Sequence, residues 1–194
     1  ETLILKKNNL IKTKPIAGTL RKTKNTNQKK ALTFFRKNEK ETKEHNMIVD
    51  MERNDLSKIC KTGSVKIDKL KKVEEYRDLF HYVTTIKGVI KNKMSNHDII
   101  SSLMPGGSVI GCPKISTIQL LNRKEKFDRN IYTGSFGIIH SNGDMRFNIM
   151  IRTLLNFKND IELSVASGVI LGSTAKKEYN ENYIKAKSLL DLFN

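Results

Sequence analysis

Long apolar runs and patterned cysteines are both missing from this chain of 194 residues. No stretch approaches the ~20 apolar residues that a membrane-spanning helix requires, so we expect no membrane association. The two cysteines, Cys60 and Cys112, lie in unrelated contexts and lack the spacing of metal ligands. We therefore expect free thiols in a reducing, cytoplasmic compartment rather than a disulfide framework.

Acidic residues are scarce beside basic ones, with 20 Asp+Glu against 36 Lys+Arg and a net charge of +16. Residues 1–43 alone carry +10 of this excess. Such a segment could bind nucleic acid, but no zinc finger, RNP aromatic motif or helix-turn-helix signature accompanies it. We expect a solvated, lysine-rich surface and no nucleic-acid partner, and keep a basic binding module as an alternative.

The start of the chain, Glu1-Thr2-Leu3, has neither an initiator Met nor the layout of a signal peptide. We expect the chain to be cut at this point. Its mass of 22.2 kDa fits one domain or half of a large one.

Apolar periodicity and turn residues divide the chain into strands and helices. Expected strands cover 2–5, 10–16, 64–67, 82–90, 131–140, 147–157 and 161–171. Expected helices cover 28–50, with 51–59 continuing or turning, then 96–103, 115–124 and 175–193. Residues 15–19 are expected to form a turn, 21–30 a mobile loop and 104–108 another loop. Because strands dominate the last third and Asn142-Gly143 is a hairpin signal, the fold class is α/β (α+β), a sandwich of antiparallel sheets flanked by helices.

Two further features suggest a ligand site without settling it. Arg152 is expected inside an apolar strand, where a guanidinium needs a carboxylate from the protein or from a ligand. Glu178 and Glu181 are three apart on one helix face, and Glu44 lies on another helix. Carboxylates that meet at one point bind a hard cation such as Mg²⁺, although solvated Glu pairs are common on helices.

Several short motifs also follow one another along the chain: Pro15-Ile16-Ala17-Gly18-Thr19, Lys43-Glu44-His45-Asn46-Met47-Ile48-Val49-Asp50, Arg53-Asn54-Asp55-Leu56, Pro105-Gly106-Gly107-Ser108, Gly111-Cys112-Pro113-Lys114, Tyr132-Thr133-Gly134-Ser135 and Glu178-Tyr179-Asn180-Glu181. In this order they resemble the chorismate-utilising enzymes, which include aminodeoxychorismate synthase component I and anthranilate synthase component I. The resemblance implies a large sandwich of two antiparallel sheets with helices outside. Residues 1–194 would be the C-terminal portion of its chorismate-binding domain, with the N-terminal part absent.

The resemblance also implies roles for individual residues. Mg²⁺ would be held by Glu44 and Glu181, with Glu178 close by, and would help the C4 hydroxyl of chorismate to leave. The substrate-binding residues would be Gly18, Tyr132, Arg152, Gly168 and Lys185. The catalytic set would be Thr19 at the ring pocket, His81 in proton transfer, and Lys114 as a motif residue.

Some positions depart from the family pattern. Ala17 stands where many aminodeoxychorismate synthases have a nucleophilic lysine, so ammonia would have to add to the ring directly. Alanine here is also what anthranilate synthases show. Ser167 replaces a glycine of the usual Gly-Gly-Gly-Ile-Val run and narrows the expected carboxylate cradle.

We expect a chorismate amination subunit that makes 4-amino-4-deoxychorismate for para-aminobenzoate and folate synthesis, with ammonia supplied by a glutamine amidotransferase subunit. Anthranilate synthase component I is the alternative. A third reading is an inactive fragment or a basic binding module.

Overall fold

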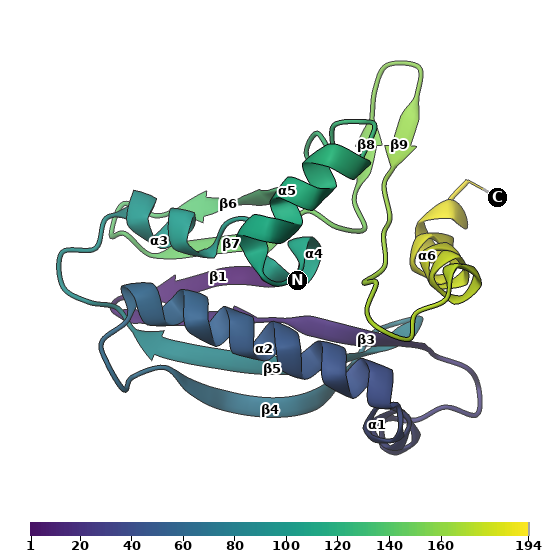
Figure 1. Cartoon of the computed structure of the whole chain (residues 1–194), viewed down its shortest axis with the longest axis horizontal. Helices are drawn as coiled ribbons and strands as arrows, with labels where there is room; N and C mark the ends of the chain where they lie inside the picture. The colour runs from purple at the N-terminus through teal and green to yellow at the C-terminus, as the bar shows by residue number, and fades with distance from the viewer. Residues whose placement is uncertain (194) are drawn as a thin grey trace.

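The computed structural model describes residues 1–193, so residue 194 of the expected domain lies outside the described residues. A seven-stranded antiparallel sheet, a two-stranded ribbon and six helices make up this part of the chain (Figure 1). The elements in chain order are β1 (Thr2–Lys7), β2 (Leu10–Lys14), β3 (Ile16–Arg21), α1 (Gln28–Lys37), α2 (Glu39–Ile59), β4 (Lys66–Glu75), β5 (Leu79–Val89), α3 (Asn96–Leu103), α4 (Gly107–Ile110), α5 (Lys114–Lys124), β6 (Ser135–Ile139), β7 (Met145–Ile149), β8 (Leu154–Asn156), β9 (Ile161–Leu163) and α6 (Ala175–Leu190). The expected α/β class with antiparallel sheets and flanking helices is confirmed.

The long strand β5 organises the sheet. One of its edges pairs with β4, while the other pairs first with β3 and then with β2 along its length. Beyond β2 the order continues through β1 and β7 to β6. Side chains of β5 are buried on both faces from Phe80 to Ile86, as the near-continuous apolar and β-branched run from Tyr82 predicts.

Residues 15–19 form a strand rather than the expected turn. Pro15 is the single residue between strands β2 and β3. Its carbonyl still accepts a hydrogen bond from the Thr84 backbone N–H. Ile16 then pairs with Val83, so β3 continues along β5 after a bulge. Proline lacks only its own backbone N–H, so Pro15 removes one donor and the residues that follow it can still pair with β5. The prediction of a turn was therefore wrong.

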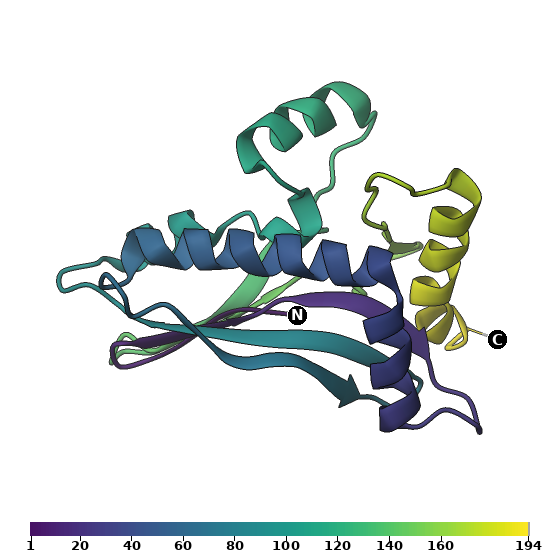
Figure 2. The same ribbon diagram turned by 60° about the horizontal axis from the view of Figure 1, so that its bottom comes forward.

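Helix α2 lies across one face of the sheet (Figure 2). Asn38 ends α1 and caps α2, because its side chain accepts a hydrogen bond from the Glu41 backbone N–H. Farther along the helix, Val49 and Leu56 pack into the main core against β1, β2, β5 and α3. Fully buried His45 joins the helix to β5 through a 2.6 Å hydrogen bond between its Nε2 and the Thr84 hydroxyl. Burial lowers the pKa of His45 to about 4, so this histidine is neutral and structural.

The last third of the chain contains less strand than expected. The expected strand over 147–157 stops at Ile149, and a second short strand, β8, begins at Leu154. Similarly, β9 covers only the first three residues of the range 161–171, and residues 107–110 form one short helix, α4, instead of a loop. Apolar composition alone does not distinguish a strand from an extended connection that packs against a neighbour, which is why these lengths were overestimated.

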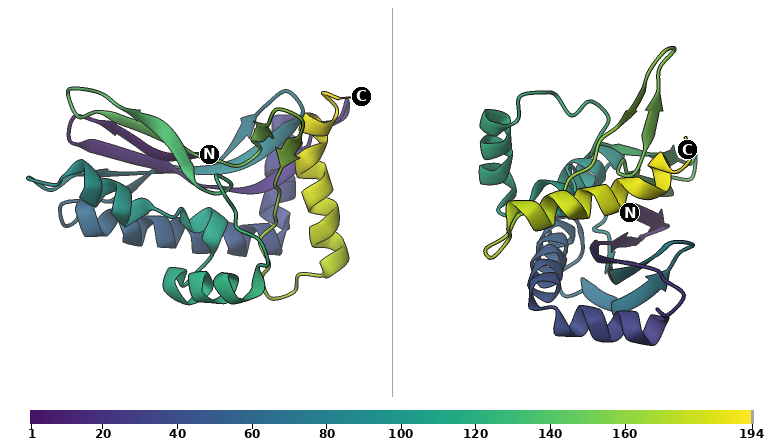
Figure 3. Two further views of the ribbon diagram at one scale, coloured as in Figure 1. Left: turned by 90° about the horizontal axis from the view of Figure 1, so that it is seen from above. Right: turned by 90° about the vertical axis from the view of Figure 1, so that its right-hand side faces the viewer.

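The last helix of the chain, α6, lies close to the start of α2. Helix α6 stands beside the N-terminal end of α2, although well over a hundred residues separate them in sequence (Figure 3). Helix α5, by contrast, projects from the body and has no buried residue (Figure 2). Within residues 1–193, no helix is both long and apolar enough to cross a membrane.

Candidate active site

Four of the predicted residues meet where β3, β5 and the loop after β7 converge. Arg152 donates from Nη1 to Nε2 of His81 at 2.7 Å and from Nη2 to the Thr19 hydroxyl at 3.3 Å. On its other side the His81 ring places Nδ1 3.3 Å from the Gly18 carbonyl and 3.4 Å from the Thr19 hydroxyl. We call Gly18, Thr19, His81 and Arg152 the arginine group.

The partners of His81 assign its proton. The Gly18 carbonyl can only accept, so Nδ1 carries the hydrogen, and Nε2 is left to accept from the guanidinium. Burial, together with the positive charge of Arg152, lowers the pKa of His81 to about 4. His81 is therefore neutral near pH 7 in this state, and any proton transfer through it would begin with His81 as the acceptor.

Arg152 is placed differently from the expectation. It lies in the bend after β7, with a φ of 51°, and not in a strand interior. Within the described part of the chain it forms hydrogen bonds to neutral groups but no ion pair. A carboxylate of the described protein is therefore not its partner, and the other alternative, a carboxylate of a ligand, stays open. A half-buried guanidinium without an anion is a suitable anchor for a ligand carboxylate.

The predicted carboxylates gather between the first turns of α2 and the face of α6. Glu178 and Glu181 from α6 meet Lys40 of α2, whose Nζ lies 2.5 Å from Glu178 Oε1 and 3.9 Å from Glu181 Oε2. Lys185 lies 2.8 Å from Glu181 Oε1 and donates to the Ala166 carbonyl at 3.1 Å. The remaining members are Glu41 and Glu44, one helical turn apart on the same face of α2. These six residues form the carboxylate group.

Negative charge exceeds positive charge in the carboxylate group, since four carboxyls face two lysines. Burial and the charges of Glu44 and Glu181 raise the pKa of Glu41 to about 7. Burial also raises the pKa of Glu44, and the charge of Glu181 adds to that effect. Burial alone would lower the pKa of Lys40, but its hydrogen bond to Glu178 and the surrounding carboxylates outweigh burial and raise it. The group therefore has room for more positive charge than its lysines supply.

The donor set fits a hard divalent cation. Oxygen ligands are what Mg²⁺ prefers, and Glu178, which is 93% buried, keeps one oxygen, Oε2, without any hydrogen-bond partner. Gly168 leaves space beside Glu44, because a Cβ at this position would come within 2.5 Å of Glu44 Oε1. Across residues 1–193 no three acidic, His or Cys side chains are already closed around one point. Lysine ammonium groups separate the carboxylates instead.

Gly18 joins the two groups. Its carbonyl faces His81, while a Cβ on its other side would come within 2.9 Å of Glu41 Oε2. Its φ of 96° also favours glycine. The arginine group and the carboxylate group therefore lie on either side of one backbone segment.

Two predicted residues lie outside both groups. Lys114 forms an ion pair with buried Asp55 and donates to the Leu103 carbonyl at 3.4 Å, so it joins α5 to α2 and α3. Tyr132 lies in the turn before β6, where burial raises its pKa and the charge of Arg129 opposes that rise. In the described structure neither residue makes a hydrogen bond or ion pair with the arginine group, so their roles at the site stay predictions.

Several residues of the site were not predicted. Lys40 and Glu41 looked like ordinary charges on a solvated helix, although their spacing from Glu44 places them on its face. The Tyr76 ring packs edge-on against His81 at 5.3 Å. Glu1 accepts a 2.6 Å hydrogen bond from Ser108, and burial raises its pKa to about 7. Glu1 is also among the charges that act on Arg152, so it provides a carboxyl that can be protonated near the site.

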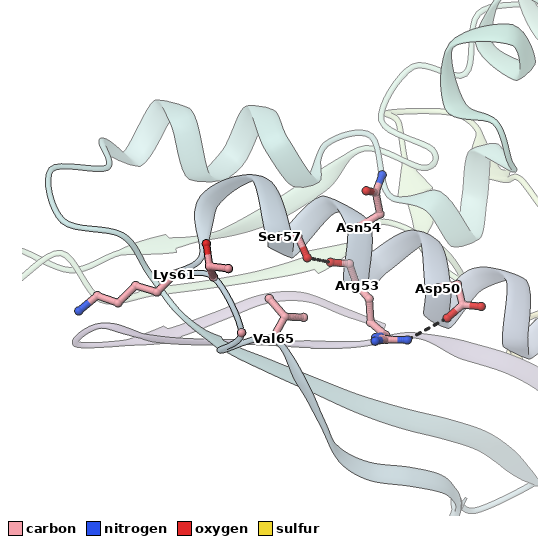
Figure 4. Close-up of a pocket in the computed structure, with 8 residues that line it drawn as sticks. Asp50, Arg53, Asn54, Ser57, Lys61 and Val65 are labelled. Atoms are coloured by element: carbon pink, nitrogen blue, oxygen red, sulfur yellow. Dashed lines mark hydrogen bonds and ion pairs between the residues drawn. The ribbon is translucent and has the colours of Figure 1, made fainter.

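A separate cavity of ≈ 410 Å³ lies at the other end of α2 and involves none of these residues. Figure 4 shows Arg53 pointing toward Asp50, with which it forms an ion pair at 3.2 Å, and Lys61 and Val65 also line the cavity. Its carboxylate and guanidinium are already paired with each other, unlike those of the two groups above.

The fold is of α/β class, and its two groups present a guanidinium without an ion pair beside a set of partly buried carboxylates. A family model described as chorismate binding enzyme matches residues 1–191, and the chain belongs to this family. Among curated relatives, aminodeoxychorismate synthase component 1 of Bacillus subtilis is 37% identical over 187 residues, covering 96% of this chain and 40% of that protein. An anthranilate synthase component 1 of Haloarcula marismortui is 35% identical over 192 residues, covering 98% of this chain and 39% of that one.

Solved structures agree. Anthranilate synthase component I from Streptococcus pneumoniae superposes with a TM-score of 0.80 at 35% identity, over 97% of this chain and 41% of that chain. The menaquinone-specific isochorismate synthase MenF of Escherichia coli superposes with a TM-score of 0.88 at 24% identity, over 100% and 44%, and this likeness concerns the fold alone. The chain thus spans about two fifths of the length of the curated relatives named here.

Proposed function

We propose that the protein aminates chorismate at C4 to give 4-amino-4-deoxychorismate, as a subunit that uses ammonia from a glutamine amidotransferase. The observation that carries the proposal is the pairing of Arg152, which has no ion pair in the described structure, with a carboxylate group one backbone segment away. Chorismate is a dicarboxylate with a poor leaving group. It needs a cationic anchor at one end and acid or Lewis-acid assistance near the other.

Each group has a separate task in this proposal. Arg152, held in place by His81 and Thr19, would bind the enolpyruvyl carboxylate through its guanidinium. Glu44, Glu178 and Glu181 would hold Mg²⁺, with Lys185 beside them and the Gly168 backbone leaving space for the ring carboxylate. When bound, the metal would supply the Lewis acidity that helps the C4 hydroxyl to leave. Glu1, with its raised pKa, would be the nearby proton donor.

Ala17 supports direct addition of ammonia. Its side chain is buried, its carbonyl faces His45, and it has no group that could attack the ring. A covalent intermediate at this position is therefore not part of the proposal. The chain's free cysteines, buried Cys60 and exposed Cys112, fit a cytoplasmic setting for the same enzyme.

Anthranilate synthesis is the second candidate, because Ala17 and the relatives named anthranilate synthase favour it. Both candidates use the same substrate and metal, and they differ in the position of amination and in the loss of pyruvate. Incubation of the intact protein with chorismate, Mg²⁺ and ammonium, followed by product identification, separates them. We expect 4-amino-4-deoxychorismate. Fluorescent anthranilate would decide for the second candidate, and absence of both turnover and chorismate binding would contradict both.

A further inference from the structure

We propose that Lys40 occupies the cation position of the carboxylate group, so that a divalent cation binds by displacing its ammonium group from Glu178. The inference rests on the metal site proposed above and concerns a residue for which no role has been assigned.

The ion pairs of Lys40 place its ammonium among the predicted metal ligands. The Lys40 ammonium lies between two carboxylates of α6, at 2.5 Å from Glu178 and 3.9 Å from Glu181. It comes from α2, four residues before Glu44 and therefore on the same helix face. Charges from all three predicted metal ligands act on Lys40. Its ammonium thus lies where a cation shared by these ligands would lie.

Two buried side-chain oxygens of α6 have no hydrogen-bond partner. Lys40 donates to Glu178 Oε1, while Oε2 of the same carboxylate is buried and has no hydrogen-bond partner of its own. Burial would raise the pKa of Glu178, but Lys40 and the Ser173 and Ser167 hydroxyls outweigh burial and lower it. Oδ1 of Asn182, one helical turn farther along α6, is also buried and without a partner. A buried oxygen without a partner is costly, and two on one face of α6 indicate a group with more ligand capacity than one ammonium can use.

Lys40 lies in the first turn of α2, a position that does not favour a positive charge. A cation in the first turn of a helix is opposed by the helix dipole, and the neighbouring Glu39 and Glu41 are the residue type that this turn favours. Lys43, three residues later, is exposed, and among the described residues its one ion pair is with Glu39. Lys40 instead withdraws into the carboxylate group, with a flexible stem that can also carry its ammonium out again.

Displacement has a measurable consequence. Every metal ion that binds must break the Lys40–Glu178 ion pair, so the affinity of the site is lower than its carboxylates alone would give. Replacing Lys40 with methionine keeps the length of the side chain and removes the competing charge. We expect Lys40→Met to bind Mn²⁺ at least tenfold more tightly than the unchanged protein.

The test is titration of the intact protein with Mn²⁺, followed by electron paramagnetic resonance of the free ion, without substrate. Lys43→Met is the matched control, since it removes the same charge from the same helix at an exposed position, and we expect its affinity to stay within twofold. Glu178→Gln identifies the site, because binding there should be lost. An unchanged or weaker affinity in Lys40→Met would overturn the displacement.

A crystal structure with bound Mn²⁺ separates displacement from a general effect of charge. We expect the ion on Glu178 and the Lys40 ammonium more than 4 Å from that carboxylate. An ion bound with the Lys40–Glu178 pair intact would overturn the inference while leaving the proposed function in place. Absence of Glu178-dependent Mn²⁺ binding in every variant would overturn the proposed metal site, and the inference with it.

Discussion

The two ends of α2 treat buried charge in opposite ways. At the far end, Asp55 is paired with both Lys58 and Lys114, and buried Glu52 accepts a 3.1 Å hydrogen bond from Thr13. At the near end, the carboxylate group has fewer cations than anions and an oxygen of Glu178 without a partner. The first arrangement serves stability, because Asp55 is paired within the chain and burial favours the neutral form of Glu52. The second leaves negative charge for which the described residues supply too few cations.

The largest expected effect concerns the far end. Asp55→Asn leaves Lys114 largely buried without its anion, and loss of one partner of a buried pair costs about 3–5 kcal/mol. Urea unfolding should show this loss, while turnover per folded molecule stays close to that of the parent protein. A loss under about 1 kcal/mol would remove the contrast between the two ends.

The next largest effect concerns the near end of α2, where we expect a substitution to lower turnover and not stability. Glu44→Gln removes one negative charge from a crowded group, so we expect the free energy of unfolding to stay the same or to rise slightly. Chorismate turnover should fall about 100-fold, because a metal ligand is lost. Steady-state kinetics and urea unfolding on one preparation check both parts. Destabilisation without loss of turnover would show that the near end is structural as well.

A smaller effect concerns how the charge of Glu52 changes stability with pH. Burial raises its pKa to about 7 from 4.5, so the folded protein binds this proton more tightly than the unfolded chain does. Ionisation of Glu52 therefore costs stability as the pH rises from 4.5 through 7, and the cost is absent below pH 4.5. Glu52→Gln should be about 3 kcal/mol more stable than the parent at pH 8 and close to it near pH 4.5. An equal offset at both pH values, measured by urea unfolding, would contradict this assignment.

The smallest effect concerns space rather than charge. A Cβ added by Gly168→Ala would press on the flexible end of Glu44, which can move aside at little cost in stability. We expect Mn²⁺ affinity to fall severalfold and the free energy of unfolding to change by less than about 1 kcal/mol. Unchanged Mn²⁺ affinity would show that Gly168 does not shape the site.

Local signals were sufficient to predict much of the fold. The apolar run of β5, the helical character of residues 28–59 and the Asn142-Gly143 hairpin between β6 and β7 follow from periodicity and turn chemistry. The single helix expected over 28–50 is divided at Asn38 into α1 and α2. The continuation of the strand beyond Pro15 and the early end of β7 do not, because neighbouring strands and not local propensity decide them.

The site divides in the same way. Glu44, Glu178 and Glu181 were identified through motifs, and the structure brings them together. Lys40 was missed because a lysine near a helix start looks solvated, and its partner Glu178 lies 138 residues away. Lys114 was grouped with the site on its motif alone, whereas its buried partner Asp55 belongs to the far end of α2. Such partners depend on tertiary packing, which no local pattern encodes.

A crystal structure of the intact protein with Mg²⁺ and chorismate tests the central claim most directly. The account predicts the enolpyruvyl carboxylate on Arg152 and the metal on Glu44, Glu178 and Glu181, with Gly18 between them. Chorismate bound elsewhere, such as in the cavity beside Arg53, with the carboxylate group still closed by its lysines, would contradict it.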